Sequence, residues 1–195
     1  MLASNASPFS PSQVAARFAK GIDRTKFGMM KLVKDIEDVL DFLEKSFLVS
    51  YIEIDDFNNA TPLANVGLNK KYYFNDNGMR YINCVSKVKA NSNCLENAVY
   101  LELISRGIKP KGKILLNKKK EVVGEIDFNY TLGERDYHLQ VTHTLTDINF
   151  SSEIGNLLLV EPDSFKGLVY IKDLSSSANK EICMLKDDKF FKGIF

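Results

Sequence analysis

The sequence is poor in the residues that most metal, redox and nucleotide sites require. It has two histidines, three cysteines and no GxxxxGK[ST] loop, so this chain cannot hold a nucleotide by the P-loop route. The cysteines, Cys84, Cys94 and Cys183, are odd in number and show no CxxC spacing. We therefore expect reduced thiols in a cytoplasmic protein, with neither a disulfide framework nor a zinc site.

Long apolar runs and an excess of one charge are also missing. No segment is apolar enough to span a bilayer, and the N-terminus lacks a signal-peptide pattern, so we expect no membrane partner. The net charge of +1 provides no global field for nucleic acid, so any such binding would need a local patch. The 195 residues, 45% of them hydrophobic, can bury one good core or two small ones.

The first half of the chain has the pattern of a winged helix, in which helices are followed by a two-stranded wing. Apolar residues recur at helical spacing and then alternate as in a strand. The expected helices span residues 11–20 and 29–47, and the expected strands 49–54 and 70–74, with a loop at 55–69 and a turn at 75–78.

The second half has the order helix, three meandering strands, helix, strand, which is typical of an α/β sandwich. Gly107 stands where a helix C-cap is expected. After a polar connector near 87–93, the expected helices span 95–106 and 149–159, and the strands 113–116, 122–130, 137–145 and 167–171, with one more at 182–185.

Three stations along this half have the layout of a PD-(D/E)XK nuclease centre. Such enzymes hold Mg²⁺ with a helix carboxylate, a strand Asp and a further carboxylate placed two residues before a Lys. The chain offers Glu96 on the helix, Asp127 on the middle strand, and Gln140 with Thr142 at the third station. Gln140 and Thr142 share a strand face, but a neutral amide is a poor Mg²⁺ ligand and Thr carries no cation. We therefore expect the remnant of a nuclease site, without catalytic residues. Glu96 and Asp127 are weak candidates for metal ligands, and we do not expect Mg²⁺ as a cofactor.

Five sequence blocks resemble the C-terminal region of a family of prokaryotic AAA-type ATPases. Residues 94–107 are similar to its LENxVxLEL…RxG helix, and residues 125–128 and 139–142 to its EIDF and IQV strands. Residues 71–80 are similar to its KYYxxDxGLR block, and residues 46–49 to its ESFLI block. The order and spacing of the blocks agree as well.

The resemblance implies an N-terminal ATPase module that would precede Met1, followed by a region of uncharacterised role. It also implies a PD-(D/E)XK-like fold that carries Gln where active nucleases carry Asp or Glu; Thr142 is the clear departure. The predicted class is α+β, with a winged-helix-like segment over 1–88 and a restriction-endonuclease-like domain over 89–195.

Each candidate residue also has a structural interpretation. Glu96 could be an ordinary acid in the first turn of its helix, and Gln140 and Thr142 could be hydrogen-bonding residues at the edge of the core. Asp127 is expected to need a partner because it lies inside an apolar strand, whereas Glu125 is expected at a solvated edge. His138 lies on the strand face opposite to His143, so the two histidines cannot act as a pair.

Two predicted surface features indicate whether the chain could bind nucleic acid. Lys118, Lys119 and Lys120 form the best basic cluster, at a hairpin tip, where a solvated turn is the default interpretation and phosphate contact the minority one. The expected helix 29–47 carries an acidic face, which would repel phosphates, so protein contact is favoured there over DNA reading.

The primary hypothesis is a non-catalytic recognition or accessory region of an AAA-type ATP-binding protein, partnered by that protein's ATPase module. One alternative is a residual metal-dependent nuclease that uses Glu96 and Asp127 with Gln140. Another is a DNA-binding module that acts through the winged helix and the Lys118–Lys120 turn.

Overall fold

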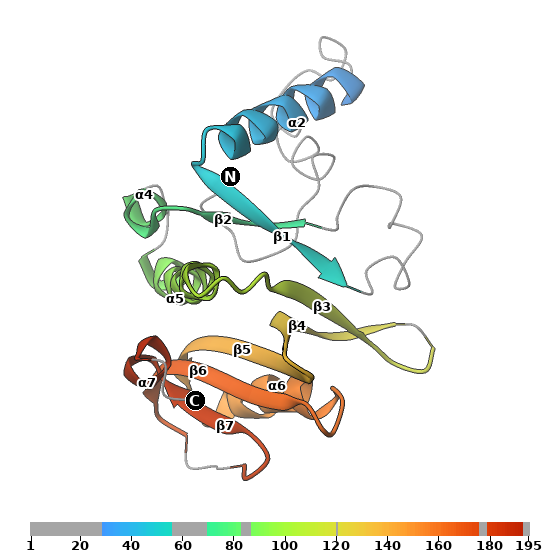
Figure 1. Cartoon of the computed structure of the whole chain (residues 1–195), viewed down its shortest axis with the longest axis vertical. Helices are drawn as coiled ribbons and strands as arrows, with labels where there is room; N and C mark the ends of the chain where they lie inside the picture. The colour runs from blue at the N-terminus through green and yellow to red at the C-terminus, as the bar shows by residue number, and fades with distance from the viewer. Residues whose placement is uncertain (1–28, 56–69, 83–86, 120, 176–178, 193–195) are drawn as a thin grey trace.

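One mixed β-sheet runs through the protein and connects its two halves (Figure 1). The computed structural model describes residues 29–55, 70–82, 87–119, 121–175 and 179–192. Seven described strands have the spatial order β2-β1-β3-β4-β5-β6-β7. They are β1 (Val49–Asp55), β2 (Lys70–Phe74), β3 (Lys111–Leu116), β4 (Val122–Leu132), β5 (Arg135–Leu145), β6 (Phe165–Asp173) and β7 (Cys183–Lys186).

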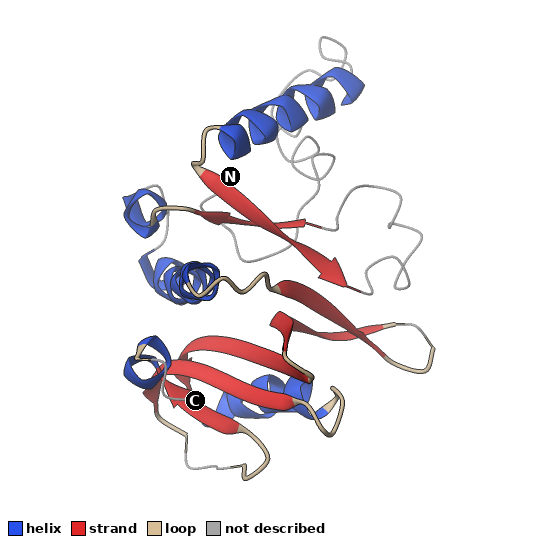
Figure 2. Cartoon of the chain, viewed as in Figure 1, coloured by secondary structure: helices blue, strands red, loops and turns tan. Residues whose placement is uncertain are grey.

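The strand direction reverses at three of the six neighbouring pairs in the sheet. Strands β1 and β2 are antiparallel, as are β3, β4 and β5, whereas β1 pairs with β3, β5 with β6, and β6 with β7 in parallel. Parallel neighbours need a crossover connection; α6 lies in the connection from β5 to β6, and α4 and α5 lie in the connection from β1 to β3, which also contains β2. The described helices are α2 (Met29–Lys45), α4 (Asn77–Ile82), α5 (Lys87–Ser105), α6 (Asp147–Leu158) and α7 (Asp187–Phe191) (Figure 2).

Helices α5 and α6 cover opposite faces of the sheet. Leu168 and Val169 are consecutive on β6 and therefore point to opposite faces. Val169 belongs to the core that α5 fills with Val99, and Leu168 belongs to the core that α6 fills with Leu157. The protein thus has two packed layers of core around one sheet.

The wing strands are part of this architecture. On one side, α2 packs Ile36 and Leu40 against a separate small core with Val49, Tyr72 and Phe74. On the other side, Ile52 and Tyr73 join the core of α5. The segments 1–88 and 89–195 therefore share a sheet, connected by the pairs Ile54↔Gly112 and Asp55↔Lys113.

A bulge in β4 reverses the side-chain alternation at the centre of the sheet. Ile126 and Phe128 are two residues apart, yet Ile126 lies in the core of α6 and Phe128 in the core of α5. The pairing with β3 shifts at this point, because Lys111 pairs with Asn129 and Lys113 with Ile126. One extra residue on a strand bends it and redirects its side chains.

The mixed α+β class is confirmed, as are the expected helices and strands that lie in the described residues. Gly107 has φ 76° and closes α5, with Ile108 N–H donating to Leu103 O and Gly107 N–H to Ile104 O, the Schellman pattern. The expected helix 11–20, most of the loop 55–69 and Cys84 lie outside the described residues. Cys94 and Cys183 are free thiols.

Two local expectations are wrong, and one short helix was not predicted. The connector 87–93 belongs to α5, and residues of the expected turn 75–78 begin α4. Asp187–Phe191 forms α7, which the sequence pattern did not indicate because this helix is five residues long. Among the described helices, none is long and apolar enough to cross a membrane.

Candidate functional site

A buried lysine surrounded by three carboxylates lies where strand β2 meets α5 and β4. Only 1% of the Lys71 side chain is exposed. Its Nζ lies 2.8 Å from Glu96 Oε1, 3.0 Å from Glu125 Oε1 and 3.2 Å from Asp127 Oδ1. The Tyr73 hydroxyl donates to the same Glu96 oxygen at 2.8 Å. We call Lys71, Glu96, Glu125 and Asp127 the Lys71 cluster.

Each member is placed by a regular element. Lys71 and Tyr73 are two residues apart on β2, so both point toward α5, while Tyr72 and Phe74 point toward α2. Glu96 reaches the cluster from the middle of α5. The side chain of the next residue, Asn97, holds the helix to the strand through both backbone groups of Phe74. Phe74 N–H donates to Asn97 Oδ1, and Asn97 Nδ2 donates to Phe74 O, each at 2.9 Å.

Asp127 lies where two strands separate. The described ladder between β4 and β5 ends at the pair Phe128↔Leu139. One step further, the backbone N–H of Val141 donates to Asp127 Oδ2 at 2.9 Å, so a carboxylate replaces the missing strand partner. The bulge turns the same side chain toward Lys71, which leaves Asp127 with one oxygen on the backbone and one on the ammonium.

The Lys71 cluster contains one basic and three acidic side chains, and burial affects the pKa values of Lys71, Glu96 and Glu125. Burial raises the pKa of Glu96 to about 7, although the neighbouring Lys71 ammonium opposes the shift. Burial also raises the pKa of the Glu125 carboxyl, again against the pull of Lys71. Burial alone would favour a neutral amine at Lys71, but the surrounding acids, led by Glu96, hold the pKa of Lys71 well above its ordinary value. Lys71 is therefore a cation at neutral pH, and the pKa values of its partners Glu96 and Glu125 are raised.

The third station of the nuclease layout faces another helix. Gln140 is buried, and its side chain lies beside Glu153 of α6. Burial, together with the charge of Asp127, raises the pKa of Glu153 to about 7. Thr142 is buried too, and its hydroxyl accepts from Asn149 Nδ2 at 3.4 Å. Gln140 and Thr142 therefore contact α6. At this third station β5 has no acidic residue, and Glu153 of α6 provides a carboxyl group instead.

The structure thus brings together Glu96 and Asp127, as expected for a remnant site. Two expectations about neighbouring acids are wrong. Glu96 is not in the first turn of its helix, because α5 begins at Lys87, and Glu125 is not at a solvated edge, because it pairs with Lys71.

Lys71 and Glu153 were missed as members of the site. The signal for Lys71 was a lysine that directly precedes the aromatic run Tyr72-Tyr73-Phe74 in the same strand. Glu153 follows Phe150 by three residues and precedes Leu157 by four, which is the helical spacing of the face that packs on the sheet.

The basic turn lies on the surface. Lys118 and Lys119 are exposed, and Lys120 lies outside the described residues. Asn117 Oδ1 accepts from the backbone N–H of Lys119 at 2.8 Å and of Glu121 at 3.0 Å, which fixes the turn locally.

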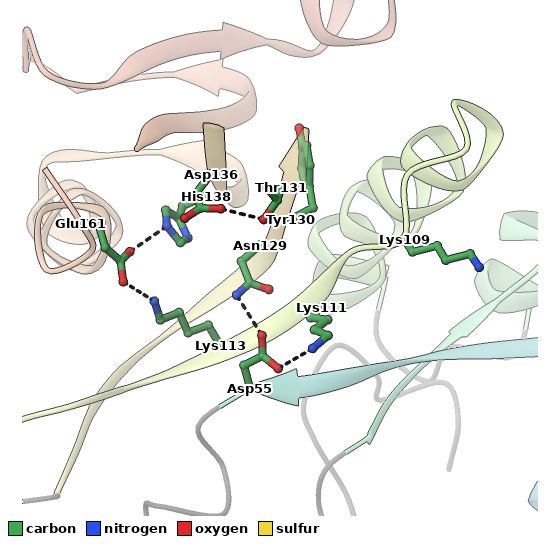
Figure 3. A pocket seen from close by; sticks show the side chains of 10 residues that line it. All are labelled: Asp55, Lys109, Lys111, Lys113, Asn129, Tyr130, Thr131, Asp136, His138 and Glu161. Atoms are coloured by element: carbon green, nitrogen blue, oxygen red, sulfur yellow. Dashed lines mark hydrogen bonds and ion pairs between the residues drawn. The ribbon is translucent and has the colours of Figure 1, made fainter. Parts of the chain in front are cut away.

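A polar pocket of about 300 Å³ lies elsewhere on the sheet, between the end of β1 and the strands β3, β4 and β5 (Figure 3). Glu161, in the segment between α6 and β6, accepts from Lys113 Nζ at 2.8 Å and lies 3.0 Å from His138 Nε2. Lys111 Nζ donates to Asp55 at 2.9 Å. No member of the Lys71 cluster lines this pocket.

Within the described residues, no group of three or more His, Cys, Asp or Glu side chains is arranged to hold a metal ion. In the Lys71 cluster, the carboxylates converge on an ammonium. Glu96 and Asp127, the residues named as metal candidates, therefore share one cation that the chain itself provides.

Comparison with known proteins places the chain in no family. A scan against protein-family models found no match, and a search of the curated proteins found none. One solved structure, the crystal structure of protein VC1899 from Vibrio cholerae, is similar over 93% of this chain and 47% of its own length, with 12% identity and a TM-score of 0.36. This chain therefore spans about half the length of that protein, and a TM-score of this size carries no functional argument.

Proposed function

We propose that this chain is a non-catalytic recognition or accessory region of an AAA-type ATP-binding protein, with a PD-(D/E)XK-like domain whose metal-binding centre is closed by Lys71. The observation that carries the proposal is the position of the Lys71 ammonium within 3.2 Å of three carboxylates. The resemblance of the sequence blocks supplies the ATPase context.

The physical reason is competition for the same oxygens. Mg²⁺ requires carboxylate oxygens at about 2.0–2.1 Å in near-octahedral geometry. Here one oxygen each of Glu96, Glu125 and Asp127 already accepts from Nζ, and Tyr73 occupies Glu96 as well. An incoming ion would have to displace an ammonium that is fully buried and tethered to β2, which would leave that ammonium without compensation.

The finer fold assignment rests on the same region. Support for a PD-(D/E)XK-like core comes from Glu96 on a helix that packs on the sheet and from Asp127 where β4 and β5 separate. Support for a winged-helix-like segment comes from α2 followed directly by the antiparallel pair of β1 and β2.

Cleavage assays test the absence of catalysis. The chain is incubated with single-stranded, duplex and branched DNA in Mg²⁺ or Mn²⁺, and products are resolved on denaturing gels. We expect no cleavage above that of the Asp127→Ala variant. Cleavage by the natural sequence that Asp127→Ala abolishes would overturn the proposal.

The proposed association with an ATPase module rests on the exposed surface of helix α2. Its exposed surface combines Phe42, 65% exposed, and Val39, 50% exposed, with the exposed acids Asp38 and Asp41. Such a surface repels phosphates and suits a protein partner with apolar and basic side chains. We expect Phe42→Ser to weaken association with an AAA-type ATPase module in a pull-down, and Lys118→Ser, in the β3–β4 turn, to leave it unchanged. Equal association of both variants would argue against α2 as the contact.

A residual metal-dependent nuclease is the second candidate, and Glu153 is the observation that favours it. Its carboxyl group lies beside Gln140 and near Asp127, at the position where the strand itself has no acid. Calorimetric titration with Mn²⁺ separates the two candidates. A stoichiometric site that is lost in both Asp127→Ala and Glu153→Gln supports the nuclease, and heats no larger than those of the variants support the accessory role.

A further inference from the structure

Phe47, in the turn between α2 and β1, has an unfavourable backbone conformation and exposes its ring. Its φ is 55°, and among the described residues it is the one non-glycine residue with a positive φ. This conformation crowds Cβ against the backbone and costs free energy in residues other than glycine. The side chain is nevertheless 82% exposed and belongs to none of the apolar cores of the described residues. Internal packing therefore does not explain why a phenylalanine stands at this position.

Hydrogen bonds on both sides of the turn fix the backbone of Phe47. Its N–H donates to Glu44 O, and the N–H of Leu48 donates to Leu43 O, each at 3.0 Å. These two bonds form the Schellman pattern that ends a helix. From the end of β2, Asn75 Nδ2 donates to Phe47 O at 2.7 Å. The exposed ring is thus attached to a backbone whose conformation is already set.

Helix α5 ends in the same pattern with a different residue. Gly107 stands at the position that corresponds to Phe47, with a φ of 76°. Glycine adopts this conformation without a Cβ penalty. The turn therefore does not require an aromatic side chain, and Phe47 carries a strain that the fold does not need. Residues held in such conformations cluster at functional sites, where the strain serves binding or catalysis.

Phe47 extends the apolar and acidic surface of α2. Ser46 N–H donates to Phe42 O at 2.9 Å, so Phe47 directly follows the helical turn that begins at Phe42. Val39 and Phe42 are both exposed and are neighbours on the helix surface, because they are three residues apart. The exposed charged residues in this half of the helix are Glu37, Asp38, Asp41 and Lys45. Three acids against one lysine, together with the negative end of the helix dipole, surround the apolar side chains with negative charge.

We propose, on the basis of the proposed accessory role, that Phe47 anchors the α2 surface in an apolar pocket of a protein partner whose rim carries lysine or arginine side chains. The acids of α2 complement such a rim and disfavour nucleic acid or an anionic membrane. Aromatic anchors provide much of the binding energy at protein interfaces, and a ring on a fixed backbone loses less conformational entropy on binding. The strained conformation therefore lowers stability and strengthens association.

The test measures stability and association in the same variant. Phe47→Asn removes the ring and introduces a residue that accepts a positive φ. We expect its urea unfolding midpoint to be equal to or higher than that of the natural sequence, because the strain is relieved. We expect its affinity for an AAA-type ATPase module, measured by calorimetry, to fall about tenfold, as for an aromatic anchor. A merely structural role would lower the midpoint and the affinity together.

Leu174→Asn is the matched control. Leu174 is 69% exposed and follows β6, in the part of the sheet that lies opposite to α2 in Figure 1, so its replacement should leave the affinity unchanged. The proposal is overturned if Phe47→Asn binds as tightly as the natural sequence, if Leu174→Asn weakens binding equally, or if the unfolding midpoint of Phe47→Asn falls. Dimerisation of the natural chain in sedimentation experiments that Phe47→Asn abolishes would assign the surface to a second copy of the chain and also overturn the proposal.

Failure of this inference can be told apart from failure of the proposed accessory role. If Phe42→Ser weakens association and Phe47→Asn does not, the accessory role stands and only Phe47 is excluded as the anchor. If the natural chain does not bind the ATPase module at all, both are contradicted.

Discussion

Lysines pair with carboxylates in two regions of this molecule, and the regions differ in their access to water. In the Lys71 cluster the lysine is 1% exposed and contacts three acids. In the pocket, the Lys111 and Asp55 side chains are 49% and 40% exposed, and Lys113 pairs with a Glu161 that is 57% exposed. The same residue types should therefore contribute very differently to stability, because water screens one set of charges and not the other.

The comparison also explains why a lysine is tolerated in the core. A single buried ammonium is costly, but three carboxylates and the strand geometry fix its position. Around the pocket the ion pairs are partly exposed, so water screens them and each contributes little to stability.

The largest expected effect comes from removing the buried cation. Lys71→Met leaves three acids around a neutral side chain, and we expect the free energy of unfolding at pH 8 to fall by about 3–5 kcal/mol. The loss should be smaller at pH 5, because the Glu96 carboxyl, with a pKa of about 7, is then protonated. Urea denaturation at both pH values measures this. Lys111→Met is the matched control and should cost less than about 1 kcal/mol; equal losses in the two variants would contradict the comparison.

A second variant removes the amide that holds the helix of the buried cluster to its strand. Asn97→Ala leaves the backbone N–H and C=O of Phe74 unpaired in the core. We expect a loss of about 2–3 kcal/mol in the free energy of unfolding. Asn129→Ala is the counterpart at the pocket, where the amide reaches Asp55 at 3.5 Å, and it should cost about 1 kcal/mol or less. A reversed order would show that the pocket, and not the cluster, is the rigid region.

The protonation of Glu153 gives a pH-dependent prediction. Its pKa is about 7 in the folded chain against an ordinary value of 4.5, so the folded state binds this proton more tightly than the unfolded state. Its contribution to stability is fully present below about pH 4.5 and is lost as the pH rises through 7. We therefore expect Glu153→Gln to gain stability relative to the natural sequence between pH 5 and pH 8, by about 1 kcal/mol. The exposed Glu121→Gln should show no such gain, and a gain of the same size there would point to a general charge effect.

The smallest expected effect concerns the pocket. Burial and the Lys113 ammonium both lower the pKa of His138, so Lys113→Met should move that pKa upward toward its ordinary value. An NMR titration of the imidazole signals measures it, with Lys118→Met as a control that leaves the pKa unchanged. A pKa of His138 that stays the same in Lys113→Met would show that solvent already screens this pair.

Regular periodicity made all the described strands and the longer helices α2, α5 and α6 predictable, but not the short helices α4 and α7. It also gave the shared strand face on which Gln140 and Thr142 lie. It could not give the bulge in β4, because a single extra residue leaves no mark in an alternating pattern. Without the bulge, Asp127 and Phe128 are expected on opposite faces. Glu125 was expected at a solvated edge because its partner, Lys71, comes from a distant strand. The sequence likewise placed Glu96 on a helix but not in its middle, since the polar residues 87–93 resembled a connector.

By itself, the amino-acid sequence determined the α+β class, the order of the strands along the chain and the Gly107 helix end. These depend on local periodicity and on spacing within neighbouring elements. Only the tertiary structure placed Lys71 among three carboxylates, those of Glu96 and Asp127 included, and Glu153 beside Gln140. Those outcomes depend on contacts between distant strands and helices, where burial decides which charges pair and which titrate.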